Sequence, residues 1–172
     1  MSEGPAERPL DIRRLFEVLD RHRVEYLVIG GVAVQVHGHR RTTKDLDLMP
    51  GPGPENAARL AAALEELRAR VAGQASGPEL SAADAERLAL AAVVPPLATE
   101  HGELHLLPEP RGASGWAQMR SRALVVDLDG AEVSIVGLDD LLRMKVAMGR
   151  QRDLDDIAVL TAIERDAREP GH

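Results

Sequence analysis

The sequence predicts a mixed α/β (α+β) fold, in which one sheet is flanked by helices and the last third is helical. Three observations predict it: short apolar runs bounded by Gly and Pro, amphipathic stretches with helical spacing between them, and a long helical pattern after residue 137. The length of 172 residues suits a single domain over 1–172. Within it, we expect a core sheet region at 25–136 and C-terminal helices at 138–166.

The N-terminal half opens with clear helical periodicity, because apolar residues recur at intervals of three and four from Ile12 to Leu19. The pair Gly30-Gly31 ends the apolar run that follows. The Pro/Gly run at 50–54 ends the next one, since proline cannot donate to a strand ladder. The elements expected here are helices at 11–24, 32–37 and 55–71 and strands at 26–29 and 46–49.

The C-terminal half is divided by turn and cap residues. Ser81 is a good N-cap for a helix, and Asp129-Gly130 is a strong two-residue hairpin signal. Gly137 and Gly149 bound the next helical pattern. The elements expected here are helices at 81–92, 116–122, 138–148 and 152–165 and strands at 97–99, 103–107, 124–128 and 131–136.

Composition excludes several classes of function. The formal net charge of −7 argues against a protein that coats nucleic acid through bulk charge, although a local basic rim remains compatible with it. The chain has no cysteine, which rules out disulfides, thiolate zinc sites and cysteine nucleophiles. No segment resembles a signal peptide or a membrane span, so we expect a soluble cytoplasmic protein without a membrane partner.

Gly30-Gly31 lies between a predicted strand and a predicted helix. Glycine there lets the backbone approach a phosphate closely, and the start of the following helix offers unpaired amides to an anion. The same pair also fits a plain turn, so on its own it leaves both interpretations open.

Asp45 and Asp47 lie on one face of the second strand, because successive side chains alternate between faces. Two carboxylates held close together repel each other unless a cation lies between them. Mg²⁺ suits this arrangement, since it binds carboxylate oxygens together with waters and substrate phosphates. A solvated edge face is the alternative, but the glycine turn upstream, with Arg41 and Thr43 in between, favours a metal site.

Lys145 lies on the apolar stripe of the penultimate helix, where a lysine needs a partner or an anionic ligand. Alternatively, its stem packs while its ammonium reaches water. Asp153 and Asp156 lie one turn apart on the last helix and are placed to receive Lys145 or to orient Arg150. Arg150 and Arg152 also fit ordinary ion pairs on a helix surface.

Together these features resemble the nucleotidyltransferase superfamily, whose polymerase-β-like core places a Gly-Gly or Gly-Ser turn before an Asp-x-Asp strand. More narrowly, the chain is similar to the AbiEii-type toxin branch of that superfamily over Tyr26 to Leu160, with little contribution from 51–97. The residues that carry the resemblance are Gly30-Gly31-Val32-Ala33, His37-Gly38, Arg41, Thr43, Asp45-Leu46-Asp47, Lys145 and the stretch 150–156.

The resemblance implies a mixed nucleotidyltransferase-like sheet and transfer of a nucleoside monophosphate from a nucleoside triphosphate to an acceptor, with Mg²⁺ or Mn²⁺ as cofactor. It implies that Asp45 and Asp47 hold the metal and act in catalysis with Lys145, which contacts phosphate. The remaining residues are Gly30, Gly31, Arg41, Thr43 and Arg150 for nucleotide and phosphate binding, and Asp153 and Asp156 for supporting the site or orienting the acceptor. The toxin branch implies a tRNA or protein acceptor and a cognate antitoxin.

One position departs from the superfamily pattern. A third carboxylate is expected on a later strand, but the position two apolar residues before Pro108 holds His105. Imidazole suits transition metals better than magnesium, and Glu103 on the same strand face is the alternative third ligand. If neither replaces the acid, the chain is a catalytically impaired nucleotide-binding or regulatory module. An antibiotic-modifying nucleotidyltransferase and a pure interaction domain are further alternatives.

Overall fold

The computed structural model describes residues 8–74 and 77–169, in which seven strands form one mixed sheet with the order β3-β4-β5-β2-β1-β7-β6. At its centre, β1 runs antiparallel to β2 and parallel to β7, while β2 runs parallel to β5. The predicted fold class is therefore confirmed. The strands are β1 (Tyr26–Ile29), β2 (Asp45–Pro50), β3 (Arg70–Val71), β4 (Leu97–Thr99), β5 (Gly102–Leu106), β6 (Leu124–Leu128) and β7 (Ala131–Ile135).

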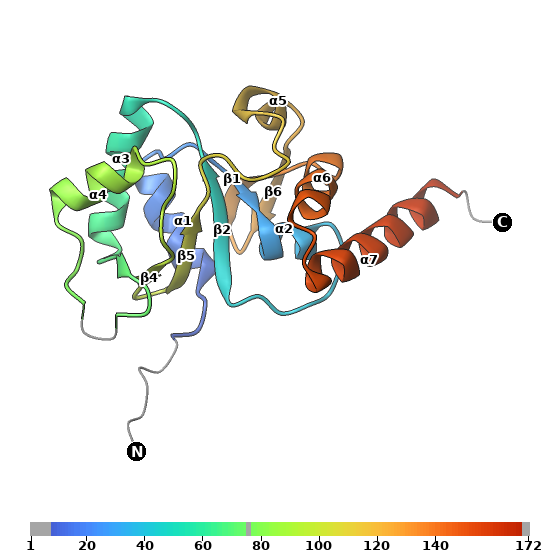
Figure 1. The fold of residues 1–172 in the computed structure, drawn as a ribbon, viewed down its shortest axis with the longest axis horizontal. Helices are drawn as coiled ribbons and strands as arrows, with labels where there is room; N and C mark the ends of the chain where they lie inside the picture. Colours follow the sequence, from blue (N-terminus) through green and yellow to red (C-terminus); the bar gives the residue numbers. More distant parts are fainter. Residues whose placement is uncertain (1–7, 75–76, 170–172) are drawn as a thin grey trace, which may run out of the picture.

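Helices lie at both ends of the molecule. Figure 1 shows α3 and α4 at one end and the pair α6 and α7 at the other, with β1 and β2 between them. The helices are α1 (Ile12–Arg21), α2 (Gly30–Val36), α3 (Pro54–Glu66), α4 (Ala82–Ala89), α5 (Trp116–Ser121), α6 (Leu138–Met148) and α7 (Gln151–Arg168).

The predicted helix at 55–71 is wrong at its C-terminal end. The helix stops at Glu66, and Arg68 adopts a positive φ of 51° that reverses the chain. Arg70–Val71 then form β3, which pairs with β4. Helical periodicity continues through this segment, but pairing with a strand distant in sequence overrides it. The helix predicted at 81–92 likewise ends early, at Ala89.

The stripe predicted for the penultimate helix needs one correction. Met148, expected to face inward, is 42% exposed, and Met144 is buried in its place. Lys145 is buried on the same side as Leu141, as the stripe predicts. Gly149 takes the left-handed conformation that ends the helix, with φ 64°.

Packing in the core determines which face of β2 presents the carboxylates. Leu46 and Leu48 are almost fully buried, whereas Asp45 and Asp47, which alternate with them, are only partly buried. The strand is therefore anchored by its leucines, and its carboxylates are turned toward the opposite face.

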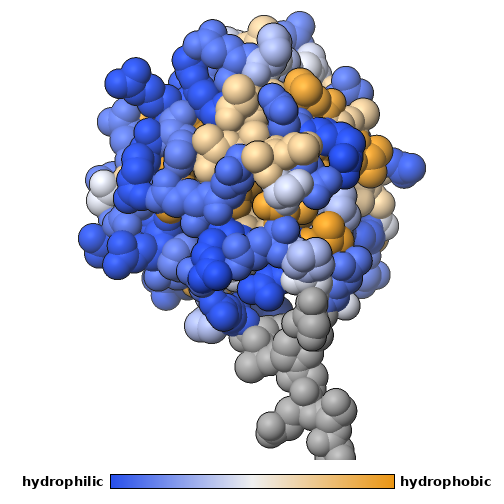
Figure 2. Space-filling view, turned by 90° about the vertical axis from the view of Figure 1, so that its left-hand side faces the viewer, coloured by the Kyte–Doolittle hydropathy of each residue, from blue (hydrophilic) through white to orange (hydrophobic). Residues whose placement is uncertain are grey.

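The face of the molecule drawn in Figure 2 is largely hydrophilic, with one apolar area. Figure 2 shows apolar side chains gathered in a patch on the side that carries α3 and α4. Leu90 and Val93, which follow α4, are 63% and 84% exposed. Across residues 8–74 and 77–169, every helix is too short or too polar to cross a bilayer.

Candidate functional site

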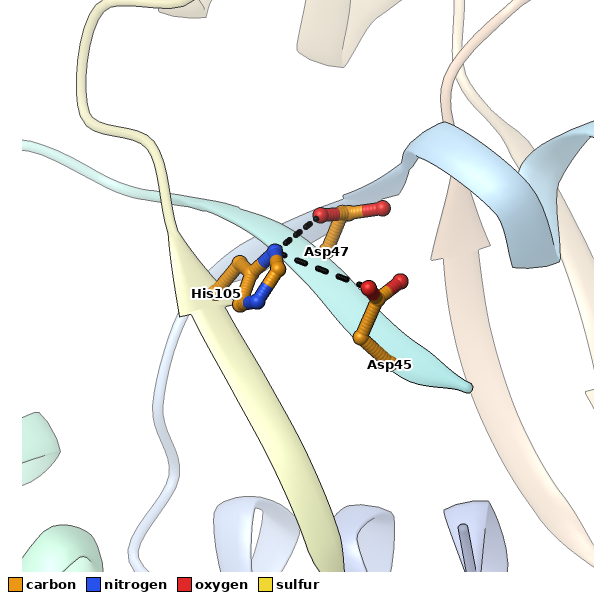
Figure 3. Close-up of side chains that lie close together, drawn as sticks. All are labelled: Asp45, Asp47 and His105. Carbon is orange, nitrogen blue, oxygen red and sulfur yellow. Dashed lines mark hydrogen bonds and ion pairs between the residues drawn. The ribbon is translucent and has the colours of Figure 1, made fainter. Parts of the chain in front are cut away.

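Asp45 and Asp47 from β2 and His105 from β5 point toward one another (Figure 3). The parallel register places Asp47 beside His105. The Nδ1 atom of His105 lies 3.1 Å from Oδ1 of Asp47 and 3.9 Å from Oδ2 of Asp45. One potential ligand atom from each residue lies within 4.8 Å of the others, so a single metal ion fits between all three.

Glu103 stands on the far side of the His105 ring. Its Oε1 atom lies 2.6 Å from Nε2 of His105. The hydrogen bond with Asp47 is the main cause that raises the pKa of His105 to about 9, against a smaller opposing effect of burial, and the bond with Glu103 adds to the rise. The imidazolium form is therefore favoured at neutral pH, because its positive charge lies between carboxylates.

The glycine turn lies directly against the carboxylate of Asp47. Gly30 has a positive φ of 62°, and a Cβ atom at this position would lie 2.0 Å from Oδ2 of Asp47. A Cβ atom on Gly31 would lie 2.5 Å from Oγ1 of Thr43, and the Gly31 amide donates to Oδ2 of Asp47 over 3.4 Å. Only glycine fits both positions, so bare backbone borders the group formed by Asp45, Asp47 and His105.

A cavity of about 440 Å³ opens beside this turn. Its lining includes apolar side chains, among them Val93, Val94, Leu107 and Met144. It also includes most of the residues that the sequence assigns to the site. These are Gly30, Gly31, Arg41, Asp47, His105, Lys145, Arg150 and Asp153.

Lys145 is held by two buried carboxylates. Its Nζ atom lies 3.0 Å from Oδ1 of Asp153 and 2.8 Å from Oδ2 of Asp156, and both aspartate side chains are 1% exposed. The Lys145 side chain is itself only 6% exposed, so the alternative in which its ammonium reaches water is wrong. Asp156 also lies 2.9 Å from Nε of Arg41, which ties the segment before β2 to α6 and α7. We call Arg41, Lys145, Arg150, Asp153 and Asp156 the ion-pair cluster.

Arg150 completes this cluster at the start of α7. Its Nε donates to Oδ2 of Asp153 over 2.7 Å. Burial by itself would raise the pKa of Asp153, but the hydrogen bonds from Arg150 and Lys145 outweigh it and lower this pKa to about 2. The pKa of Arg150 is raised, mainly by its hydrogen bond to Asp153 and further by the charges of Asp47 and Asp45. Arg150 therefore lies within the electric field of Asp45 and Asp47.

Two further arginines line the cavity. Arg111 belongs to the loop after β5, and Arg152 lies in the first turn of α7. Among the residues that the structure describes, neither side chain makes a hydrogen bond or an ion pair, unlike the other cavity arginines. Sequence reasoning missed Arg111, because nothing in its Pro/Gly-rich loop indicates where the side chain points. It offered surface ion pairs for Arg152, and the structure places none there.

Other predicted residues lie outside this cavity. A second cavity of about 940 Å³ lies on the other side of the group formed by Asp45, Asp47 and His105. Its lining includes Thr43, Asp45 and Glu103. Its lining also includes Arg8, Arg70 and Lys44. Asp156 lies behind the first cavity rather than on its wall.

Comparison with known proteins places the fold. The solution structure of the antibiotic-resistance factor ANT(2'')-Ia aligns with a TM-score of 0.58 and 15% identity, over 88% of this chain and 80% of that chain. The crystal structure of a Thermotoga maritima protein proposed to be a nucleotidyltransferase aligns with a TM-score of 0.53 and 12% identity, over 88% of this chain and 90% of that one. No protein-family model and no curated protein matches the sequence.

These likenesses show that the chain has a nucleotidyltransferase-type fold. At identities of 15% and 12% they concern the fold alone. What the chain does must therefore be argued from its own side chains.

Proposed function

We propose that this protein is a metal-dependent nucleotidyltransferase, which moves a nucleoside monophosphate from a nucleoside triphosphate to an acceptor hydroxyl. The observation that carries the proposal is the contact between the glycine turn and Asp47. A polyphosphate lying on bare backbone at Gly30-Gly31 would touch the metal held by Asp45, Asp47 and His105.

Within this proposal, a metal ion held by Asp45, Asp47 and His105 would supply positive charge against the transferring phosphoryl group. Two carboxylates and an imidazole would supply the protein ligands for a divalent ion, Mg²⁺ or Mn²⁺. The acceptor oxygen forms a bond to the α-phosphorus, and the bond from that phosphorus to the bridging oxygen of the β-phosphate breaks. Pyrophosphate leaves, and the hydroxyl proton passes to solvent or to a neighbouring carboxylate.

The cationic residues divide into two groups with different tasks. Arg41, Lys145 and Arg150 are held by Asp153 and Asp156, so they form a fixed positive border to the cavity. Each keeps some of its hydrogen-bonding capacity for phosphate, since an ammonium has three donors and a guanidinium has five. In this assignment, Asp153 and Asp156 hold those cations in place.

Arg111 and Arg152 can move toward a ligand, because neither is held by a carboxylate among the described residues. We assign them to the outer phosphates of the triphosphate. The apolar side chains in the lining, among them Val93 and Met144, suit the base and ribose.

For the acceptor, we favour tRNA over a small antibiotic. The second cavity meets the metal cluster at Asp45, and Arg8 and Arg70 on its wall suit a polyanion. A tRNA acceptor agrees with the resemblance to the AbiEii-type toxins. The same resemblance implies a protein as the alternative acceptor, and a cognate antitoxin as a partner. Fold likeness to the antibiotic-resistance factor ANT(2'')-Ia favours a second candidate, an antibiotic acceptor.

A labelling experiment tests the proposal. The protein is incubated with each of the four α-³²P-labelled nucleoside triphosphates, with Mg²⁺ or Mn²⁺, and with tRNA, cell protein or an aminoglycoside. We expect label in one acceptor class with at least one nucleotide. Asp45→Ala and Asp47→Ala should each reduce it by about 100-fold or more, because each removes a metal ligand.

Asp166→Ala is the matched control, because Asp166 is an exposed aspartate on α7. It should leave labelling unchanged. Nucleotide binding by calorimetry without labelling of any acceptor would instead favour the catalytically impaired module. Absence of both binding and labelling would contradict the proposal and favour the interaction domain.

A further inference from the structure

We propose that the metal site is selective for a first-row transition ion such as Mn²⁺ over Mg²⁺, with His105 as a nitrogen ligand and Glu103 as the residue that orients its ring. This inference rests on the metal ligands assigned under the proposed function. It adds the identity of the metal and a separate role for Glu103.

The two nitrogens of His105 face different partners. Nδ1 faces the two aspartates, at 3.1 Å from Asp47 and 3.9 Å from Asp45. Nε2 faces Glu103 at 2.6 Å. A metal ion would displace the proton on Nδ1, and with Nε2 still donating to Glu103 the lone pair of Nδ1 would point at the space between the aspartates. That space is where an ion shared by the three residues would lie.

Glu103 therefore acts on the metal through His105 rather than as a ligand. It stands opposite Asp45 in the register of β5 and β2, yet its carboxylate contacts the ring nitrogen that is turned away from both aspartates. A carboxylate that accepts the second N–H of a metal-binding histidine fixes the tautomer and the ring orientation. Of the two candidates for the third ligand, this geometry selects His105.

The ligand set explains the selectivity. Mg²⁺ strongly prefers an octahedron of oxygen ligands, whereas Mn²⁺ and its heavier neighbours accept imidazole beside carboxylates. A site with two aspartates and one histidine keeps enough oxygen ligands for Mn²⁺. It gives Mg²⁺ a nitrogen that this ion binds weakly.

The test measures metal binding directly on the full chain. Mn²⁺ is titrated into the protein while the EPR signal of free Mn²⁺ is followed, and Mg²⁺ is then added as competitor. We expect Mn²⁺ to bind at least about tenfold more tightly than Mg²⁺. Pulsed EPR of bound Mn²⁺ should show coupling to an imidazole nitrogen.

Variants separate the two roles. His105→Asp restores an oxygen-only set, so the preference for Mn²⁺ should shrink and the nitrogen coupling should vanish. Glu103→Ala should weaken Mn²⁺ binding by about 10- to 100-fold, as loss of such orienting partners commonly does. Glu103→Gln keeps an acceptor for the Nε2 proton and should recover part of that loss.

His22 offers a matched control. It too contacts a glutamate through Nε2 at 2.6 Å, its partner being Glu66, but it belongs to no metal-binding group among the described residues. His22→Ala should leave Mn²⁺ binding unchanged.

In the unmodified protein, equal affinity for Mn²⁺ and Mg²⁺ would overturn the inference. Bound Mn²⁺ without coupling to an imidazole nitrogen would overturn it too. Unchanged Mn²⁺ binding in Glu103→Ala would overturn the role of Glu103. Nucleotide transfer that needs Asp45 and Asp47 but shows no metal preference would leave the proposed function standing without this inference. Selective Mn²⁺ binding with no transfer would do the reverse.

Discussion

Replacing Lys145 with methionine removes a buried positive charge while keeping a long, unbranched side chain. The Lys145 ammonium lies within 3.0 Å of carboxylate oxygens of both Asp153 and Asp156. After the substitution, Asp153 keeps its 2.7 Å hydrogen bond from Arg150. Asp156 keeps Arg41, whose Nε lies 2.9 Å from Oδ1, but its Oδ2 loses the Lys145 ammonium at 2.8 Å. Asp156 therefore loses more than Asp153, and its Oδ2 is the atom that is left poorly compensated.

Removal of one partner from a buried ion pair commonly costs about 3–5 kcal/mol. Because Asp153 stays paired, we expect Lys145→Met to lower the free energy of unfolding by about 3 kcal/mol, at the lower end of this range. Whole domains are stable by only about 5–15 kcal/mol. For a chain of this length the loss corresponds to a fall in Tm of about 6–12 °C.

Urea unfolding followed by circular dichroism measures the change. Arg13→Met is the control, because it breaks the exposed pair with Glu17 and should cost less than about 1 kcal/mol. Adding Asp156→Asn to Lys145→Met should recover part of the loss, with a coupling energy of about 1 kcal/mol or more. A loss below about 1 kcal/mol for Lys145→Met would refute the reasoning, since it would mean that the pair contributes no more than an exposed one.

Three further predictions follow from single contacts. The pKa of Asp153 is lowered from 3.8 to about 2, so its contribution to the free energy of unfolding is complete above pH 4. That contribution, about 2 kcal/mol, should be lost as the pH falls to 2. Urea titrations at several pH values should show this dependence of stability on pH, and Asp153→Asn should flatten it. Gly30→Ala should destabilise the fold and abolish transfer, whereas Gly53→Ala, also at positive φ but with open space around it, should cost only about 1–2 kcal/mol and leave transfer intact. Arg152→Ala should weaken triphosphate binding in calorimetry by about tenfold or more, while the exposed Arg120→Ala should not.

Secondary structure was predictable where local signals agree with the tertiary contacts. Asp129 and Gly130 both adopt positive φ, at 54° and 88°, which is what their hairpin signal requires. Gly137 and Gly149 cap α6 at the expected positions. The prediction failed at Arg70–Val71, because pairing with β4 is a long-range contact with no local signature.

The site divides in the same way. Strand alternation suffices to place Asp45 and Asp47 on one face, and the spacing of Asp153 and Asp156 indicates a partner for Lys145. Alternation cannot choose between Glu103 and His105, because both lie on the same strand face. Their roles are separated only by the orientation of the imidazole ring, whose Nδ1 faces Asp47 and whose Nε2 faces Glu103.

The ion-pair cluster links α7 to the strand that carries Asp45 and Asp47. Arg41 precedes β2 by a few residues, and its contact with Asp156 joins that segment to α7. The same segment contains Thr43, whose hydroxyl donates a hydrogen bond to the carbonyl of Asp45 and whose side chain fills the space beside Gly31. A substitution on α7 can therefore alter the metal site without contacting it. The effect would pass through Asp156, Arg41 and the segment before β2. Stability and catalysis should accordingly vary together along this path, whereas Arg111 and Arg152, which stand outside it, should affect only the binding of the triphosphate.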